Sequence, residues 1–569
     1  MKDRLRTVSL NNGTMNHLRK ITLKIKVVLL IAIFASSAIL LTSAGSKNFE
    51  ITRNLDIFST MFRELVVNYV DDINVSGMMK AGIDGMLSTL DPYTTFIPES
   101  EIEDVRFMTT GQYGGIGARI RPRDDRMMIV EPYKGFPAYK AGLLPGDIIL
   151  EINGQSVQGR NEDEVRTLLQ GQPGTSLSLV IERDGEPRNK SLEREVVRVD
   201  NIPYYGMLDE NTAYIKLTGF TQRASREVRE AFQELDQAHD VEAVVLDLRD
   251  NGGGLLHEAV NITNFFVEKD QLVVSTKGRL PERSTTHRTL NDPIDLNIPL
   301  AVLVNRRSAS ASEIVAGAIQ DFDRGVVIGH RTFGKGLVQN VVPLSYNTQL
   351  KITVAEYFIP SGRSIQAINY AERHEDGSVA EIPDSLKTPH ETHGGRKVYD
   401  GGGIEPDLTV TRPSPAHVTS SLIQQLMIFD FATHFQRHND SIPAPEDFLI
   451  SDDIYREFLE FIERNDFSYQ TESENLLNEL QQAANKEQYY DAIVDGLENL
   501  QQMIHQEKAQ DLITFRREIE QLLREEIVSR YHYQQGRVIV SLAADPDVDK
   551  ALNLLADRQS YHNILAGIE

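Results

Sequence analysis

The strongest constraint on the fold is the alternation of short apolar runs with helical patterns between residues 201 and 411. The runs expected to be strands are AYIKL, AVVLDLR, LAVLVN, GVVIG, VQNVVPL and LKITVAEYFI. Strands that alternate with helices favour a layered α/β architecture. We therefore expect an α/β core over residues 199–411. Residues 367–400, rich in Gly, Glu and His, are predicted to form a surface loop inserted into it.

Three regions flank this core. Residues 47–108 have the apolar spacing of helices, and residues 109–198 contain short β-type segments separated by Gly turns. Residues 412–569 are strongly helical and charged. The predicted fold class is thus multidomain α+β. It combines an N-terminal helical segment, a small β-barrel-like domain, an α/β core and a C-terminal helical domain.

The N-terminus carries a targeting or anchoring segment. Residues 27–46 contain no charge and are long enough, as a helix, to cross a bilayer. The leader, residues 1–26, holds seven Lys and Arg against the single Asp3, so it stays in the cytosol and the rest of the chain is sent outward. Two alternatives stay open: a retained transmembrane anchor, or a signal segment cleaved near Thr42-Ser43-Ala44.

Composition excludes several function classes. Lys and Arg number 59 against 83 Asp and Glu, giving a formal net charge of −24, so no nucleic acid is expected as a partner. The sequence has no cysteine, which excludes disulfides, thiolate metal sites and cysteine nucleophiles. A hydrolytic nucleophile must therefore be Ser, Thr, Asp, Lys or an activated water.

Three motifs resemble ligand sites but each lacks a required element. Residues 329–335 follow the P-loop pattern, yet Gly336 replaces the Ser or Thr that binds magnesium, and a β-type run follows. The pair His257-Glu258 lacks the second histidine of a zinc-protease helix, and residues 390–393 (HETH) have no helical context. We therefore expect no metal and no cofactor.

A peptide-binding module is indicated within residues 109–198. Its glycine cluster, YGGIGARI (113–120), precedes PAYKAGLLPGDIILEINGQSV (137–157), and the two stretches in this order resemble PDZ domains. Successive glycines let backbone N–H groups converge on a peptide's terminal carboxylate, and the strand that follows offers an edge for strand addition. The simpler alternative is a plain turn. The candidate peptide-binding residues are Gly114, Gly115, Ile116 and Gly117.

A candidate nucleophile lies in residues 300–321 (LAVLVNRRSASASEIVAGAIQD). An apolar strand leads through a small-residue loop to an amphipathic helix, and Ser310 stands where that helix begins. The simpler interpretation is a capping box, Ser310-x-x-Glu313. The functional one is that the helix N-terminus supplies free N–H groups, with that of Ala311 as the obvious oxyanion donor.

A serine needs a base, and Lys335 is the candidate. It lies between two glycines and enters a β-type run, on which Gln339 would share its face and could position the amine. A lysine with an ordinary pKa near 10.4 is protonated, so burial must lower that pKa to about 7–8. The alternative is a solvated loop lysine.

A glycine loop is the third candidate element. In AVVLDLRDNGGGLLHEAV (243–260), the glycines allow the backbone to approach a bound peptide, and Gly253 could donate the second oxyanion hydrogen bond. The alternative is an ordinary turn between strand and helix.

Several motifs follow one another in order over roughly residues 50–410. They are DPYTTF, YGGIG, the PDZ-like stretch, LDLRDNGGG, NRRSASASEIVAGAIQD, TFGKGLVQ, YFIPSGRSIQ and GGGIEPD. This order resembles the carboxyl-terminal processing (tail-specific) serine peptidases, in which a Ser/Lys dyad aided by Gln cuts proteins whose C-terminal tails bind the PDZ domain. The resemblance implies Ser310 as nucleophile, Lys335 as base, Gln339 as its aid, and Gly253 and Ala311 as oxyanion donors.

The resemblance also implies where and on what the protein acts. We expect a serine endopeptidase of the bacterial cell envelope, on the periplasmic side of the inner membrane, either anchored through residues 27–46 or secreted. Its expected partners are protein substrates with accessible C-terminal tails. The C-terminal helical domain could form a homo-oligomer or bind an adaptor. Two other functions stay open: a catalytically inactive PDZ scaffold, and a Ser/His/Asp protease that uses His257 or His330.

Overall fold

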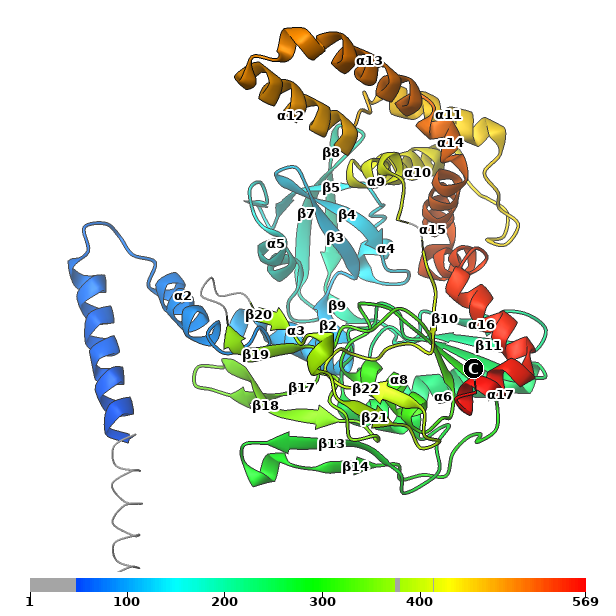
Figure 1. The fold of residues 1–569 in the computed structure, drawn as a ribbon. Coiled ribbons are helices and arrows are strands. Elements are labelled where there is room, and N and C mark those ends of the chain that lie inside the picture. The colour runs from blue at the N-terminus through cyan, green and yellow to red at the C-terminus, as the bar shows by residue number, and fades with distance from the viewer. Residues whose placement is uncertain (1–47, 374–378, 413, 569) are drawn as a thin grey trace, which may run out of the picture. The chain divides into compact units, whose positions relative to one another are not determined.

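The computed structural model describes residues 48–373, 379–412 and 414–568 (Figure 1). Two compact units divide at residue 86. The first contains a helix over residues 48–68 and most of α2 (Val75–Leu87), which confirms the helices predicted there. The expected membrane segment, residues 27–46, lies outside the described residues, and within those that are described no helix is both long and apolar enough to cross a membrane.

The PDZ-like part of the second unit is built on an antiparallel sheet with strand order β3-β4-β5-β7-β8. Strands β2 and β9 form a separate two-stranded antiparallel ladder at the two ends of this part of the chain. Apolar side chains that alternate along the strands, such as Ile129, Ile149 and Ile181, form its own buried core. The elements are β2 (Gln112–Gly115), β3 (Ala118–Arg123), β4 (Arg126–Pro132), α4 (Pro137–Lys140), β5 (Ile148–Ile152), β6 (Gln155–Ser156), α5 (Glu162–Leu169), β7 (Ser176–Arg183), β8 (Glu186–Glu193) and β9 (Glu195–Arg198).

The α/β core contains a sheet with strand order β10-β11-β12-β15-β16-β23, parallel from β11 onward. The predicted apolar runs form these central strands, because a parallel sheet is covered on both faces and needs continuous apolar sequence. The strands are β10 (Tyr204–Met207), β11 (Thr212–Lys216), β12 (Ala243–Asp247), β15 (Leu300–Val304), β16 (Val326–Gly329) and β23 (Leu408–Thr409).

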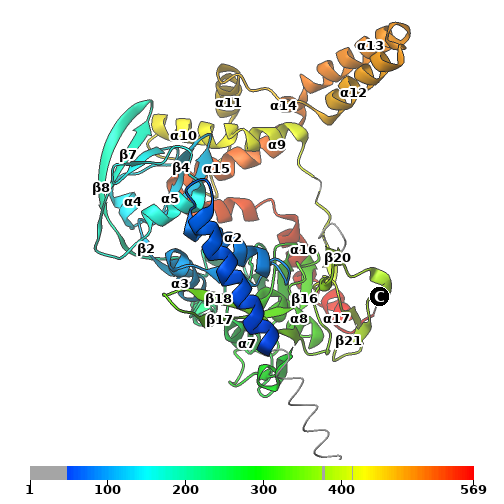
Figure 2. The ribbon, with the colours of Figure 1, turned by 90° about the vertical axis from the view of Figure 1, so that its left-hand side faces the viewer.

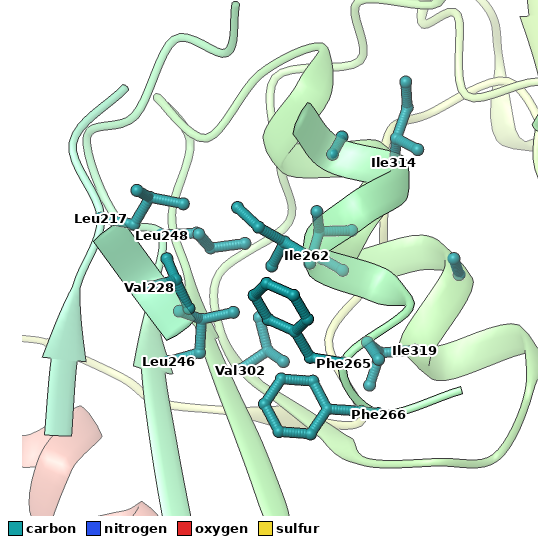
Figure 3. Close-up of a cluster of buried hydrophobic side chains, with 14 of the residues drawn as sticks. Leu217, Val228, Leu246, Leu248, Ile262, Phe265, Phe266, Val302, Ile314 and Ile319 are labelled. Atoms are coloured by element: carbon teal, nitrogen blue, oxygen red, sulfur yellow. The ribbon is translucent and has the colours of Figure 1, made fainter. Parts of the chain in front are cut away.

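Three helices cover one face of this sheet: α6 (Ala224–Ala238), α7 (Leu256–Thr263) and α8 (Ala311–Asp321). Figure 3 shows Ile262, from this helical layer, directed toward Leu246 and Val302 of the strands. The sequence predicts an amphipathic α8, but all of its residues are buried. Its second face is covered as well, so that a Cβ on Gly317 would stand 2.7 Å from a methyl group of Ile359.

The opposite face of the sheet is covered by the end of the chain. Helix α16 (Pro546–Ala556) packs Val548 and Leu555 against Val245 and Leu303, and α17 (Arg558–Leu565) adds Tyr561 to the same apolar cluster. The hydroxyl of Tyr561 accepts a hydrogen bond from the backbone N–H of Leu300 at 2.9 Å. The last helices of the region expected to be a separate C-terminal domain therefore complete the layers of the α/β core.

A second, antiparallel sheet has the strand order β1-β18-β13-β14, with β17 also paired to β18. Its strands are β1 (Thr95–Ile97), β13 (Leu272–Gly278), β14 (Thr286–Arg288), β17 (Leu337–Pro343) and β18 (Gln349–Phe358). Because β16 belongs to the first sheet and β17 to the second, residues 330–336 cross from one sheet to the other. That crossing carries Lys335.

The insertion at residues 367–400 is more ordered than the predicted surface loop. It contains two short ladders, β19 (Ile368–Arg373) with β20 (Val379–Glu381), and β21 (Pro389–Glu391) with β22 (Lys397–Tyr399). Arg396 ties it to the core through hydrogen bonds to Asp323 and Asp407, both close to 2.5 Å.

The remaining helices lie between residues 417 and 542, and those outside residues 472–508 contribute side chains to an aromatic core that includes Phe431 and Phe458. They are α9 (His417–Gln424), α10 (Met427–His438), α11 (Asp452–Arg464), α12 (Glu472–Glu487), α13 (Tyr490–Lys508), α14 (Asp511–Thr514) and α15 (Arg516–Leu542). Figure 2 shows α10 beside the PDZ-like sheet and the α12–α13 pair standing apart from it. Arg123 of β3 and Asp430 of α10 form a two-point ion pair, with both N–O distances 2.8 Å.

Candidate active site

Ser310 lies between β15 and α8, in a backbone conformation that serine rarely adopts. Its φ of 57° and ψ of −113° put it outside the helix that begins at Ala311. A non-glycine residue held this way costs about 1–3 kcal/mol and is typical of functional sites. Ser310 and Glu313 stand in the capping-box positions of α8, and the Glu313 carboxylate accepts the Ser310 N–H at 2.7 Å.

The carboxylate of Glu313 joins the serine segment to the lysine segment. This side chain is fully buried. It accepts hydrogen bonds from the Ser310 N–H at 2.7 Å, the Thr332 hydroxyl at 2.6 Å, the Gly334 N–H at 2.7 Å and the Lys335 N–H at 2.9 Å. Burial raises the pKa of Glu313, and these four donors act in the opposite direction. The buried group thus fixes the backbone of Ser310 relative to that of Lys335.

Tyr357 of β18 makes a second connection between the same two segments. Its hydroxyl lies 3.2 Å from the carbonyl oxygen of Ser310 and also contacts the carbonyl oxygen of Lys335. The side chain is buried, and burial raises its pKa well above the usual tyrosine range, so it stays a neutral donor. The contacts made by Glu313 and by Tyr357 to the serine and the lysine are all to backbone atoms, not to the side chains of Ser310 and Lys335.

Lys335 is half-buried, not a solvated loop lysine. Burial and the nearby charge of Lys351 together lower its pKa to about 8, against the opposing effect of the Glu313 and Asp91 carboxylates. Its amine lies 4.5 Å from the centre of the Tyr93 ring. A substantial fraction of the amine is therefore neutral near pH 8, which the predicted role as a base requires.

Gln339 does not contact Lys335 in the described structure. The predicted shared face assumed that both residues lie on one strand, but β17 begins at Leu337, two residues after Lys335. The register shift in this ladder passes over Val354 of β18, so it leaves the alternation of side chains along β17 unchanged. The Gln339 amide instead donates to the carbonyl oxygen of Leu337 at 3.2 Å and to the hydroxyl of Thr353 at 3.3 Å. Because Lys335 precedes β17, the alternation within that strand does not set the direction of its side chain relative to that of Gln339.

The glycine loop after β12 lies directly against the serine. Gly253 has a φ of +97°, and a Cβ built on it would stand 2.7 Å from the carbonyl oxygen of Ala309 and 2.9 Å from the nitrogen of Ala311. Only glycine allows this approach. The Gly253 N–H donates to the Asn251 side chain at 2.9 Å, and the Asn251 carbonyl oxygen accepts from the Ala309 N–H at 3.0 Å. The structure thus brings Gly253, Ser310 and Ala311 together.

The histidines of the alternative triad lie elsewhere. His257 is largely exposed on α7, with its Nε2 atom 3.4 Å from Glu258. His330 follows β16 and borders a cavity of about 230 Å3 together with Arg249. Within the described residues neither ring contacts Ser310. In the same part of the chain, no group of three or more acidic or histidine side chains is placed to hold a metal ion.

The PDZ-like domain presents β3 as a strand at the edge of its sheet. Beside it is a cavity of about 200 Å3 lined by Ile116, Ala118 and Ile120 and by Leu169 of α5. Of the predicted peptide-binding residues, Ile116 and Gly117 lie between β2 and β3, at the end of this groove.

Gly114 and Gly115 lie in β2, paired with β9, and not in an open turn. A Cβ on Gly114 would stand 2.1 Å from the carbonyl oxygen of Gly171, so glycine is needed there for close packing.

The sequence matches three family profiles. Peptidase family S41 matches residues 211–372, the PDZ domain matches residues 128–183, and the C-terminal helical domain of a probable PDZ-protease matches residues 418–555. These matches coincide with the α/β core, the PDZ-like sheet and the helices that follow.

Named relatives share most of the same regions. The carboxy-terminal-processing protease of Bartonella bacilliformis is 34% identical over 340 residues, which is 59% of this chain and 78% of the relative. A probable CtpA-like serine protease of Staphylococcus aureus is 33% identical over 315 residues, 55% of this chain and 62% of that one. Among solved structures, the photosystem II D1 C-terminal processing protease is 27% identical with a TM-score of 0.34, covering 62% of this chain and 92% of its own. The chain therefore belongs to the carboxy-terminal-processing proteases of peptidase family S41, which makes it a serine-type peptidase with a PDZ domain.

Proposed function

We propose that the peptidase uses Ser310 as its nucleophile and Lys335 as its general base, and that it cleaves proteins bound through their C-terminal tails. The observation that carries the proposal is the pair of buried links, through Glu313 and Tyr357, between the backbones of the serine and the lysine. The lowered pKa of Lys335, about 8, supports its role as a base.

The reaction begins with proton transfer from the Ser310 Oγ atom to the neutral amine of Lys335. The Oγ atom then attacks the peptide carbonyl carbon, and the negative charge that develops on the carbonyl oxygen is stabilised by the N–H of Ala311 at the start of α8. The lysine ammonium returns its proton to the leaving amine. A water that gives its proton to Lys335 then hydrolyses the acyl-serine ester.

The second oxyanion donor is assigned to Gly253. Because its N–H donates to the Asn251 side chain in the absence of substrate, the donor becomes available when that hydrogen bond is exchanged for one to the oxyanion. Gln339 is assigned an indirect role. Its amide holds the Thr353 hydroxyl, which in turn donates to the Asp91 carboxylate at 3.2 Å, and the charge of Asp91 acts on the pKa of Lys335.

Tail recognition is assigned to the groove beside β3. A peptide would pair with this edge strand and place its terminal carboxylate near Ile116 and Gly117, while an apolar side chain fills the cavity toward α5. Gly114 and Gly115, which pair with β9, then fix the position of the adjoining residues Ile116 and Gly117. Cleavage of a peptide with a free C-terminus, compared with the same peptide amidated, tests this part. We expect amidation to slow cleavage of the peptide, and equal rates would contradict tail recognition.

The location of the enzyme is assigned to the periplasmic side of the inner membrane. The support is the uncharged stretch at residues 27–46 behind a basic leader. A reporter that is active only outside the cytoplasm, fused after residue 47, should be active. Determining the N-terminus of the mature protein then distinguishes an anchor from a cleaved signal segment.

The α12–α13 pair is assigned to contact with another protein chain, either a second copy or an adaptor. Several of its large apolar side chains are exposed, namely Leu476, Leu480, Leu500 and Met503. Light scattering of the purified chain should give a mass above 64.1 kDa if the contact is between copies. A measured mass equal to that of one chain would show that the contact is not between copies and would favour an adaptor protein as the partner of the α12–α13 pair.

The experiment that tests the dyad is proteolysis of an unfolded protein with an accessible C-terminus by the full chain. Wild type and His257→Ala should cut at similar rates, whereas Ser310→Ala and Lys335→Ala should not cut. Loss of cutting with His257→Ala would instead support a histidine-based triad. Tail binding without cutting by wild type would support the scaffold alternative.

A further inference from the structure

We propose that Asp545 and Asp547, at the beginning of α16, are positioning residues for the glycine loop that follows β12 and act on it through Arg249. The inference rests on the proposed function, because the loop is the one assigned to the oxyanion. It makes the last helices of the chain part of the catalytic arrangement, although neither acid approaches the reacting atoms.

Arg249 lies two residues after β12 and bridges the sheet to α16. On one side, its Nε and Nη2 atoms lie 2.9 and 2.7 Å from the two carboxylate oxygens of Asp247. On the other side, its Nη1 atom lies 2.6 Å from Asp545 and 2.9 Å from Asp547. The guanidinium is thus held at both ends, and its side chain is only 8% exposed.

A second arginine completes the network. Arg412, three residues after β23, places its Nη2 atom 2.7 Å from Asp545 and 2.5 Å from Asp547. The two acids therefore share two cations, which balances charge where Asp547 is almost completely buried. Arg249 is bound between Asp247, at the end of a central strand, and a helix some 300 residues later in the chain.

The loop anchored by Arg249 is bonded directly to the serine segment. The hydroxyl of Ser308 donates to the carbonyl oxygen of Leu248 at 2.8 Å, and that of Ser312 donates to the carbonyl oxygen of Asn251 at 2.8 Å. These contacts lie on both sides of Ser310. A shift of the Arg249 backbone would therefore be passed to the glycine loop and to the beginning of α8.

The network is not needed merely to attach α16 to the sheet. Val548, Ala551 and Leu555 already pack the helix against the apolar face of the sheet. In addition, within the described residues one oxygen of Asp547, Oδ1, is buried without a hydrogen-bond partner, which is unfavourable for stability. Two acids that both bind Arg249, at the beginning of the glycine loop, are better explained by the position of that loop.

The decisive variant is Asp545→Asn. The Asp545 side chain is the N-cap of α16 and accepts the Asp547 N–H at 2.9 Å, and asparagine caps a helix equally well. The substitution therefore keeps size and cap and removes only the charge that holds Arg249 and Arg412. Asp549→Asn is the matched control, because Asp549 lies on the same helix but is exposed.

With a fluorogenic peptide substrate, we expect Asp545→Asn to lower kcat about ten-fold or more with little change in KM, because the loop acts on the transition state. Asp549→Asn should match wild type. Asp545→Glu keeps the charge and should recover most of the lost kcat. Unchanged kcat in Asp545→Asn, or an equal loss in Asp549→Asn, would overturn the proposal.

Hydrogen exchange provides a readout that does not depend on proteolysis. The amides of residues 249–254 should exchange faster in Asp545→Asn than in wild type, and no faster in Asp549→Asn. If wild type cleaves no substrate, the proposed function fails, yet this comparison still tests the link. If Asp545→Asn does not fold, Arg412→Gln replaces it, since that side chain is 43% exposed. If the amides of residues 249–254 exchange in Arg412→Gln at the rate measured for wild type, the proposal is contradicted.

Discussion

Glu313 accepts a hydrogen bond from the backbone N–H of Lys335 at 2.9 Å, and this buried contact connects the helix beside the serine to the segment that crosses between the two sheets. The same carboxylate accepts the N–H of Ser310 at 2.7 Å. This one carboxylate, together with the Tyr357 hydroxyl, thus links the backbones of the two residues on which the proposed chemistry depends. Because both contacts are to backbone atoms, the link persists whatever the protonation state of the lysine amine.

Replacing Glu313 should disturb this geometry with little change in size. In Glu313→Gln, either orientation of the amide turns an NH2 group toward at least one backbone N–H, so one buried donor loses its partner. Misplacement of the reacting groups by about 1 Å lowers rates about 100-fold, and we expect a loss of kcat of that order. Glu405→Gln changes an exposed carboxylate and is the control. A wild-type kcat in Glu313→Gln would contradict the assigned role.

Two adjacent glycines should differ sharply in their tolerance of alanine. Gly253→Ala places a methyl group 2.7 Å from the Ala309 carbonyl oxygen at a φ of +97°, whereas a Cβ on Gly252 meets no atom within 4 Å. The strain at positive φ alone is about 1–3 kcal/mol. Gly253→Ala should therefore lose activity and unfold at lower temperature, while Gly252→Ala should resemble wild type. Similar cleavage rates and melting temperatures for the two variants would contradict the close approach.

The rate of cleavage should rise with pH. Only the neutral amine of Lys335 can accept the serine proton, so activity is low when the lysine is protonated and reaches half its maximum near the lysine pKa of about 8. Lys351→Met provides the test of sign. Removing a nearby positive charge raises the pKa of Lys335, so the midpoint of the pH–rate profile should move to higher pH. A midpoint that stays in place or moves down would contradict this account of Lys335.

A buried ion pair at the end of α8 should contribute strongly to stability. Arg363 is 1% exposed and lies 2.8 Å from Asp321, so Arg363→Met leaves a buried carboxylate without its cation. We expect the free energy of unfolding in urea to fall by about 3–5 kcal/mol. Adding Asp321→Asn to that variant should recover part of the loss, because replacing both partners is milder than removing one. A double variant less stable than Arg363→Met would argue against the pair.

The sequence predicts the central strands well. Because these strands are buried on both faces, each one is a continuous apolar run that is easily recognised in the sequence. β8 (Glu186–Glu193) escapes such detection. Its residues are nearly all polar and exposed, and the strand exists because β7 supplies its backbone hydrogen bonds. In the same way, α8 resembles an amphipathic helix in sequence, since nothing local indicates that Ile359 will cover its second face.

The candidate site divides along similar lines. Ser310, Lys335 and Gly253 stand in recognisable motifs next to strand ends, and each could be identified from the sequence. The face shared by Lys335 and Gln339 stays a prediction, because Lys335 lies two residues before β17 and a periodic pattern does not show where a strand begins. The contact between Arg249 and Asp545 spans 296 residues, and no local signal in either segment points to the other.

The most direct test of the central claim is to identify the residue that an organophosphorus serine reagent modifies, by mass spectrometry of the full chain at pH 8. The account predicts a single modified residue, Ser310, with loss of cleavage in proportion to its modification. Lys335→Ala should react far more slowly, because its serine has no base. Modification of another residue together with loss of cleavage, or labelling of Lys335→Ala at the wild-type rate, would contradict the Ser310–Lys335 dyad.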